Sequence, residues 1–125
     1  MKNYNLKPKT EIKKRAYLYA LEVIKSLDRL PKNDLSCQVI AKQLIRSSTS
    51  IGANIVEAHA SSTKKEFTNF FHHSLKSANE SKFWPCLLRD SGKAKKELVK
   101  PLLAEAEELA NILASSILTL KGKKK

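Results

Sequence analysis

The chain has 125 residues, of which 42% are hydrophobic, and it carries a formal net charge of +12. This length fits one domain with a sizeable hydrophobic core, and the composition excludes an intrinsically disordered chain. The basic surplus indicates an anionic partner, with nucleic acid first, although a basic surface that serves only solubility stays open.

Neither the N-terminal segment nor the cysteines indicate export. The start, MKNYNLKPKT, is charged and has no apolar core of a secretory signal. No apolar run reaches the length of a membrane-spanning helix. Cys37 and Cys86 lie far apart and outside any metal-binding spacing. We therefore expect reduced thiols in a soluble, cytoplasmic protein.

Apolar residues recur at helical spacing in four successive segments. A first helix is expected over residues 10–30, where Pro31 stops it. A second is expected over residues 36–60, after two possible N-caps, Asp34 and Ser36. The apolar faces are Ile12, Ala16, Tyr19, Val23, Leu27 and Leu30 in the first helix, and Ile40, Leu44, Ile51, Ile55 and Ala58 in the second.

The third helix is expected over residues 64–88, opened by a capping box of Thr63 and Glu66. Pro85 falls inside it, and because proline removes an amide donor we expect a kink or an early end there. A fourth helix is expected over residues 94–120, followed by a basic tail at 121–125. The expected buried faces hold Phe67, Phe70, Phe71, Ser74, Leu75 and Ala78 in the third helix, and Leu98, Leu102, Leu109, Ile112, Leu113, Ile117 and Leu120 in the fourth.

The four expected helices indicate a single all-α domain over residues 1–125. No segment alternates with a period of two, so the sequence predicts no sheet. Helices joined by short loops bury their apolar faces best as an up-down-up-down antiparallel four-helix bundle.

Two stretches, RSSTSIGANIVEA and KKEFTNFFHHSLKSANES, resemble the four-helix-bundle proteins encoded in intervening sequences of bacterial 23S ribosomal RNA genes. That family closes its second helix with Arg-x-Ser-x-Ser-Ile-x-x-Asn-Ile-x-Glu-Gly and marks its third with Glu-Phe and Ser-x-x-Glu. Ala58 stands where glycine is usual, Lys76 where a small residue is common, and Pro85 interrupts the third helix. The matching residues are Arg46, Ser48, Ser50, Ile51, Asn54, Ile55, Glu57, Glu66, Phe67, Ser77 and Glu80.

This resemblance implies an assembly and a partner. It implies a homopentamer in which five bundles form a barrel around a channel, and it brings no enzymatic activity. The fold is also similar to that of the accessory variability proteins of diversity-generating retroelements, which partner a reverse transcriptase and its RNA. The resemblance thus implies association with nucleic acid or with a protein such as a reverse transcriptase.

A polar stripe accompanies the apolar face of the expected second helix. Ser47, Ser50, Asn54 and Glu57 follow one another at i, i+3, i+7 and i+10, and Arg46 lies one turn from Ser50. Ser77 and Glu80 form a matching pair on the third helix. We interpret these residues as a polar seam that hydrogen-bonds between helices or between subunits. The alternative is a two-carboxylate site of Glu57 and Glu80, but neither has the histidine three residues on that bundle metal sites use.

The other polar residues do not form a recognisable catalytic or metal site. His72 and His73 are adjacent, so on a helix they point about 100° apart and cannot easily bind one ion together. His59 lies near a helix end, and we expect all three histidines on a surface or interface. No serine sits in a nucleophile elbow and no glycine-rich phosphate loop is present. We expect no enzyme, no metal and no cofactor.

An antiparallel bundle places both chain ends and the loop between the second and third helices at one pole. That pole collects lysines, which suit phosphate contact more than base readout, so we expect weakly selective, salt-dependent binding to RNA or DNA. A basic tail that aids only solubility, and a protein-interaction adaptor such as a reverse transcriptase accessory subunit, stay open. The candidate nucleic-acid-binding residues are Lys9, Lys13, Lys14, Arg15, Lys64, Lys65, Lys121, Lys123, Lys124 and Lys125.

Overall fold

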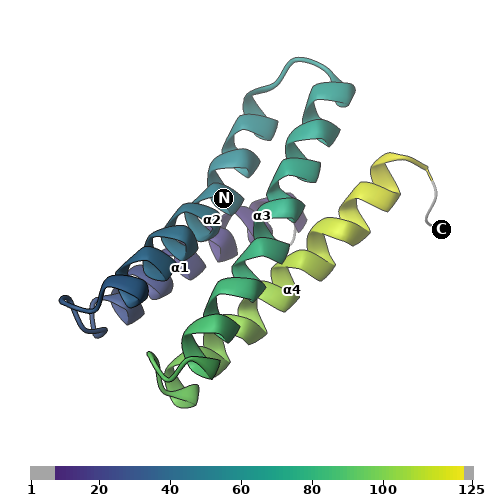
Figure 1. Cartoon of the computed structure of the whole chain (residues 1–125). Helices are drawn as coiled ribbons and strands as arrows, with labels where there is room; N and C mark the ends of the chain where they lie inside the picture. The colour runs from purple at the N-terminus through teal and green to yellow at the C-terminus, as the bar shows by residue number, and fades with distance from the viewer. Residues whose placement is uncertain (1–7, 123–125) are drawn as a thin grey trace.

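Four helices run antiparallel to their neighbours in chain order (Figure 1). A computed structural model describes residues 8–122, with side chains from residue 11 onward. Within that part of the chain every regular element is helical, which confirms the all-α prediction. The helices are α1 (Pro8–Leu27), α2 (Leu35–Ala60), α3 (Lys64–Asp90) and α4 (Lys96–Leu120).

The helices pack as a ring of four neighbours. α2 packs against α3, α3 against α4, and α1 against both α2 and α4. No Cα atom of α1 lies within 8 Å of a Cα atom of α3 in the described structure, so the two helices lie on a diagonal of the bundle. The α1–α2 and α3–α4 loops share one end, and the α2–α3 loop and the end of α4 lie towards the other (Figure 1).

Side-chain caps fix the starts of α2 and α3. Of the two possible caps of α2, Asp34 is used, and its Oδ1 accepts a hydrogen bond from the Cys37 amide at 3.0 Å. Thr63 Oγ1 accepts from the Glu66 amide at 3.1 Å. The Glu66 carboxylate reaches back to the Ser62 amide at 3.1 Å. The predicted capping box is therefore present, although Glu66 bonds one residue further back than that motif requires.

Of the kink or early end expected at Pro85, the early end is wrong. The helix continues through Pro85 to Asp90, and Pro85 is among the fully buried side chains. Burial of the ring offsets the one amide donor that proline lacks. The turn falls at Gly92, whose φ of 78° suits glycine and whose amide donates to the Arg89 carbonyl at 3.1 Å.

The core contains most of the apolar residues expected from helical spacing. Phe67, Phe70 and Leu75 of α3 are only partly buried and pack against it. Cys37 is buried and Cys86 half-buried, and both are free thiols. None of the helices in residues 8–122 is long and apolar enough to cross a membrane. The predicted residues that are fully buried are Ile12, Ala16, Tyr19, Val23, Leu44, Ile51, Ile55, Ala58, Phe71, Ala78, Leu102, Leu109 and Leu113.

Candidate functional site

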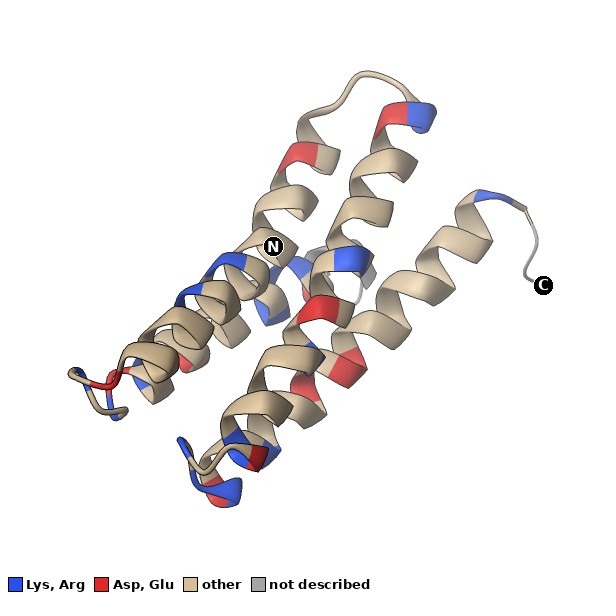
Figure 2. Ribbon diagram, in the orientation of Figure 1, with Lys and Arg blue, Asp and Glu red and all other residues tan. Residues whose placement is uncertain are grey.

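The lysines predicted to bind phosphate are exposed wherever the structure describes them. Lys13 and Lys14 lie on the first turns of α1, and Lys64 and Lys65 open α3 (Figure 2). Lys121 caps the C-terminal end of α4. The side chain of Lys9 and all of Lys123, Lys124 and Lys125 lie outside the described residues. The five described lysines are called the basic end below: Lys13, Lys14, Lys64, Lys65 and Lys121.

Arg15 differs from these five lysines because its charge is paired within the chain. Its guanidinium donates two hydrogen bonds to the Glu105 carboxylate of α4, at 3.0 and 2.8 Å, and lies 3.9 Å from Glu108. The hydrogen bonding to Glu105 raises the pKa of Arg15 above its ordinary value. Because the charge is already paired within the chain, Arg15 joins α1 to α4 instead of offering a free contact to phosphate.

The four lysines of α1 and α3 in the basic end form two groups and not one patch. Since α1 and α3 lie on a diagonal, Lys13 and Lys14 are separated from Lys64 and Lys65 across the bundle. A ligand that contacts both groups must be long enough to pass around α2 or α4.

Ion pairs tie up part of the positive charge at the opposite end. Lys93 Nζ lies 2.8 Å from Asp34 Oδ2, which joins the α3–α4 loop to the start of α2. Arg89 pairs with its neighbour Asp90 at 2.8 Å. Figure 2 accordingly shows acidic and basic residues interleaved around these two loops.

Of the five α2 residues in the predicted polar seam, only Ser47 is buried. Ser47 is fully buried against α3 and accepts a hydrogen bond from Ser81 Oγ at 3.0 Å. Ser50 and Asn54 are half-buried, and each bonds a carbonyl of α2 itself: Ser50 Oγ donates to Arg46 O at 2.7 Å and Asn54 Nδ2 to Ser50 O at 2.9 Å. The contact between α2 and α3 through this stripe therefore rests on Ser47.

A second polar contact between α2 and α3 lies nearer the surface. Arg46 pairs with the Glu80 carboxylate and also donates to Gln43 Oε1. Trp84 Nε1 donates to the same Glu80 carboxylate at 3.0 Å. The predicted residues Arg46 and Glu80 are thus brought together, whereas Ser77 is half-buried and contributes its carbonyl, which accepts from Ser81 at 2.9 Å.

The alternative of a two-carboxylate site is wrong. Glu80 lies beside Arg46, while Glu57 lies three turns further along α2, about 16 Å away by helix rise. Glu57 is exposed and has no hydrogen bond or ion pair with the part of the chain that the structure describes. The two carboxylates cannot act on one ligand atom within a single chain.

Buried serines of α3, one of them outside the predicted faces, complete the contact between α2 and α3. Ser74 and Ser81 are fully buried, and Ser74 Oγ donates to the Ile51 carbonyl of α2 at 2.8 Å. With Ala78 they follow one another at i, i+4 and i+7, so they present a narrow, small-residue face to α2. Sequence reasoning placed Ser74 on the buried face but missed Ser81, whose spacing from Ser74 was the available signal.

Tyr19 places a hydroxyl group in the same region of the core. It is 2% exposed, and its hydroxyl has no hydrogen-bond partner among the described residues although Ser81 is near. Burial raises the pKa of this hydroxyl well above its ordinary value, so it stays protonated at physiological pH.

The histidines offer no metal site. Within the described residues, no three His, Cys, Asp or Glu side chains lie close enough to hold an ion. His59 packs against Phe67, with ring centroids 5.6 Å apart, and His73 packs against Phe70 at 6.3 Å.

The chain is similar to known proteins both in sequence and in structure. The sequence model of the 23S rRNA-intervening sequence proteins matches residues 8–115. The chain belongs to that family. A crystal structure from Bacteroides thetaiotaomicron, described as a protein of unknown function from the S23 ribosomal protein family, is 30% identical with a TM-score of 0.82. The match covers 89% of this chain and 98% of the solved chain. No curated protein matches the chain.

Proposed function

We propose that the chain is a non-catalytic, oligomeric protein that associates with RNA or DNA through the phosphate backbone. The observation that carries the proposal is the set of exposed lysines of the basic end, which have no ion pair within the described structure. A net charge of +12 adds attraction for any polyanion. Lysine acts as a point charge, so binding should be weakly selective for sequence.

The test is titration of a long RNA and a DNA duplex at several salt concentrations. One variant carries Glu in place of Lys13, Lys14, Lys64 and Lys65. Each phosphate contact that these substitutions remove should reduce the salt slope on duplex DNA by about 0.9, and affinity should fall steeply. A separate variant that lacks residues 123–125 measures the contribution of the tail.

A matched control separates a binding site from bulk charge. It replaces Lys32, Lys95, Lys96 and Lys100 by Glu; these exposed lysines lie around the opposite end and on the first turns of α4. Both variants change four lysines to glutamates, so the net charge falls equally. The proposal requires the basic-end variant to lose far more affinity. Equal losses in the two variants, or none in the first, contradict it.

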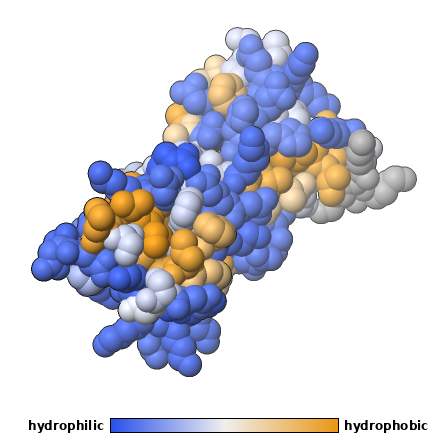
Figure 3. Space-filling model, in the orientation of Figure 1, coloured by the Kyte–Doolittle hydropathy of each residue, from blue (hydrophilic) through white to orange (hydrophobic). Residues whose placement is uncertain are grey.

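The proposed oligomer is a homopentamer, and an exposed apolar surface supports subunit contact. Leu35 and Val39 of α2 are 81% and 51% exposed, and Phe83 and Leu87 of α3 are 55% and 38% exposed. Arg46 of α2 pairs with Glu80 of α3, and the two helices are antiparallel. Val39, seven residues before Arg46, therefore lies at the level of Leu87, seven residues after Glu80, and close to Phe83. Figure 3 shows apolar side chains gathered over this half of α2 and α3. These four residues are called the α2–α3 apolar face.

Native mass spectrometry tests the assembly. We expect a pentamer that Phe83→Glu disperses, because a charge placed in a buried interface is costly. Leu118→Glu, at an apolar residue of α4 that is 45% exposed, is the control and should leave the assembly unchanged. A stable monomer of the unaltered protein at micromolar concentration contradicts the proposal.

The second candidate function is a protein-interaction adaptor, for example an accessory subunit of a reverse transcriptase. Apolar side chains outside the α2–α3 apolar face favour it: Tyr17 is 65% exposed, and Leu21, Ile24 and Val56 also reach solvent. Binding of purified protein to bare RNA or DNA discriminates the two functions. An adaptor that meets nucleic acid only through its partner would bind neither alone.

A further inference from the structure

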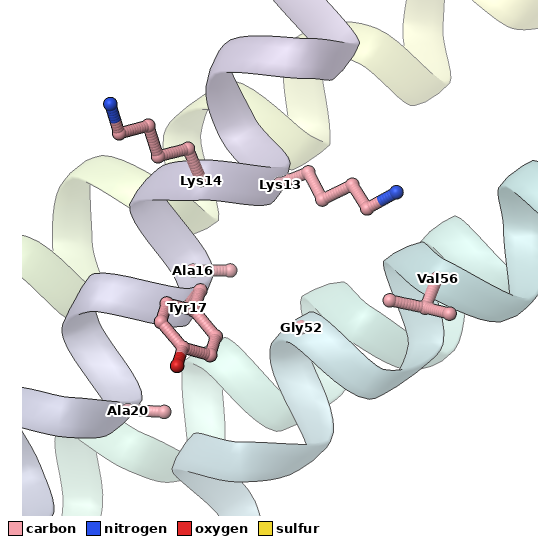
Figure 4. Close-up of a pocket in the computed structure, with 7 residues that line it drawn as sticks. All are labelled: Lys13, Lys14, Ala16, Tyr17, Ala20, Gly52 and Val56. Atoms are coloured by element: carbon pink, nitrogen blue, oxygen red, sulfur yellow. The ribbon is translucent and has the colours of Figure 1, made fainter.

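A groove runs along the outside of α1 and α2 where small residues let the two helices approach. A Cβ atom added to Gly52 of α2 would lie 3.5 Å from the Ala16 Cβ of α1, in ordinary van der Waals contact. Beside this contact lies a cavity of about 470 Å³ (Figure 4). Besides Ala16, it is lined by Lys13, Lys14, Tyr17, Ala20, Gly52 and Val56. This cavity is called the α1–α2 groove.

The groove is apolar except at one end. Ala16, Ala20 and Val56 face the space between the helices, and Lys13 reaches across its mouth from α1 towards α2 (Figure 4). Lys14 points away on the other side of α1 (Figure 4). The positive charge therefore stands beside the Val56 end, and the floor offers no side-chain group that could hydrogen-bond a ligand.

Exposed apolar residues continue the groove along both helices. Leu21 and Ile24 follow Tyr17 at i+4 and i+7 on α1, and they are 36% and 39% exposed. Ile45 precedes Gly52 by seven residues on α2 and is 38% exposed. From Lys13 to Ile24 the apolar strip extends about 16 Å by helix rise, which equals about three helical turns.

These features match the way in which a groove between two helices receives a third helix. Such grooves take apolar side chains of an amphipathic helix at i, i+3 or i+4, and i+7. Lys13 at one end selects acidic residues in the ligand by charge complementarity. We propose that the α1–α2 groove binds an acidic amphipathic helix, about three turns long, of another protein.

Neither nucleic acid nor a second copy of the chain fits the groove as well. Phosphates would gain no hydrogen bond from Leu21, Ile24 and Ile45, which lack polar groups, and would lose hydration beside them. A second copy would bring a formal net charge of +12 towards Lys13, so it matches the charge at this end of the groove less well than an acidic ligand does.

The inference rests on the adaptor function and names its partner by chemistry. A photo-crosslinking amino acid at position 17, in cells that make the protein, identifies what occupies the groove. Support requires a crosslinked segment of another protein that has amphipathic helical spacing and acidic residues. Crosslinks to the same chain, crosslinks to nucleic acid, or no crosslink overturn the proposal. A parallel crosslinker at Phe83 reports on the α2–α3 apolar face, so a partner captured only there keeps the adaptor function and rejects this groove.

A synthetic peptide of the captured segment then tests the site with purified protein. Gly52→Leu fills the groove and Tyr17→Ala removes its exposed aromatic wall, and each should weaken binding about tenfold or more. Lys13→Glu should weaken it at low salt, while Lys95→Glu, at an exposed lysine of the opposite end, is the matched control. Circular dichroism verifies folding, and Tyr17→Ala decides the matter if Gly52→Leu disturbs the bundle. Binding that both groove variants leave unchanged refutes the inference.

Discussion

Replacing Ser81 by leucine tests how tightly α2 packs against α3. The Ser81 side chain is fully buried, and its hydroxyl lies 3.0 Å from Ser47 Oγ. Leucine adds bulk where the two helices already touch, and overpacking a core position costs about 1–3 kcal/mol. Loss of the hydrogen bond between the serines adds about 1 kcal/mol. We expect the free energy of unfolding to fall by about 2–4 kcal/mol.

Thermal and urea unfolding, followed by circular dichroism, measure this loss. In a domain of this size 1 kcal/mol shifts the Tm by about 4 °C. Ser81→Leu should therefore lower the Tm by about 8–16 °C. Ser81→Ala removes the hydroxyl, with its hydrogen bonding to Ser47 and to the Ser77 carbonyl, without adding bulk, and should lower the Tm by about 4 °C. Asn79→Leu introduces the same side chain at an exposed position of α3 and should change the Tm little.

The order of the three variants decides the test. If Ser81→Leu melts as Asn79→Leu does, the two helices have room for a leucine and the small serines do not set their separation. If Ser81→Ala destabilises as much as Ser81→Leu, the hydrogen bond matters more than the packing. Each protein is compared at the same concentration, because assembly contributes to the apparent Tm.

Three further substitutions test single interactions. Tyr19→Phe removes a buried hydroxyl that has no hydrogen-bond partner among the described residues, so urea unfolding should show equal stability or a gain of up to about 1 kcal/mol. The ion pair with Lys93 lowers the pKa of Asp34 in the folded state. The stabilisation that this pair gives to the fold is therefore complete above the unfolded-state pKa near 4, and it is lost as the pH falls through the lower folded-state pKa. Melting curves between neutral pH and pH about 2.5 should therefore fall less steeply for Asp34→Asn than for the unaltered protein. Arg15→Gln should lower stability by up to about 1 kcal/mol by breaking the pair with Glu105, and leave the affinity for RNA unchanged in the titration described above.

The helices could be predicted because burial follows a period of 3.6 residues. Each expected boundary lies within three residues of the observed one; for example, α1 was expected to end at residue 30 and ends at Leu27. Pro85 shows the limit of local reasoning. Its effect on hydrogen bonding is visible in the sequence, whereas the burial of its ring depends on helices far along the chain.

The polar seam was predicted from spacing, and the same geometry explains why Glu57, at its far end, is exposed. Ten residues of an α-helix turn through about 1000°, which is about 80° short of three full turns. Glu57 is thus rotated away from Ser47 and reaches solvent, although each step along the stripe is helical. The pair of Arg15 and Glu105 could not be found in this way, because 90 residues separate the partners and only the packing of α1 on α4 brings them together.

Lys13 and Lys14 link the two proposed binding surfaces. They belong to the basic end, and they also line the α1–α2 groove. An acidic helix in that groove would neutralise charge that phosphate contact needs, and nucleic acid would screen the charge that attracts the helix. Linkage makes this effect mutual, so each ligand lowers the affinity for the other by the same factor. The separation of Lys64 and Lys65 across the bundle limits the effect, since they stay available to nucleic acid while the groove is filled. The two proposed functions therefore compete at α1 and remain independent at the start of α3.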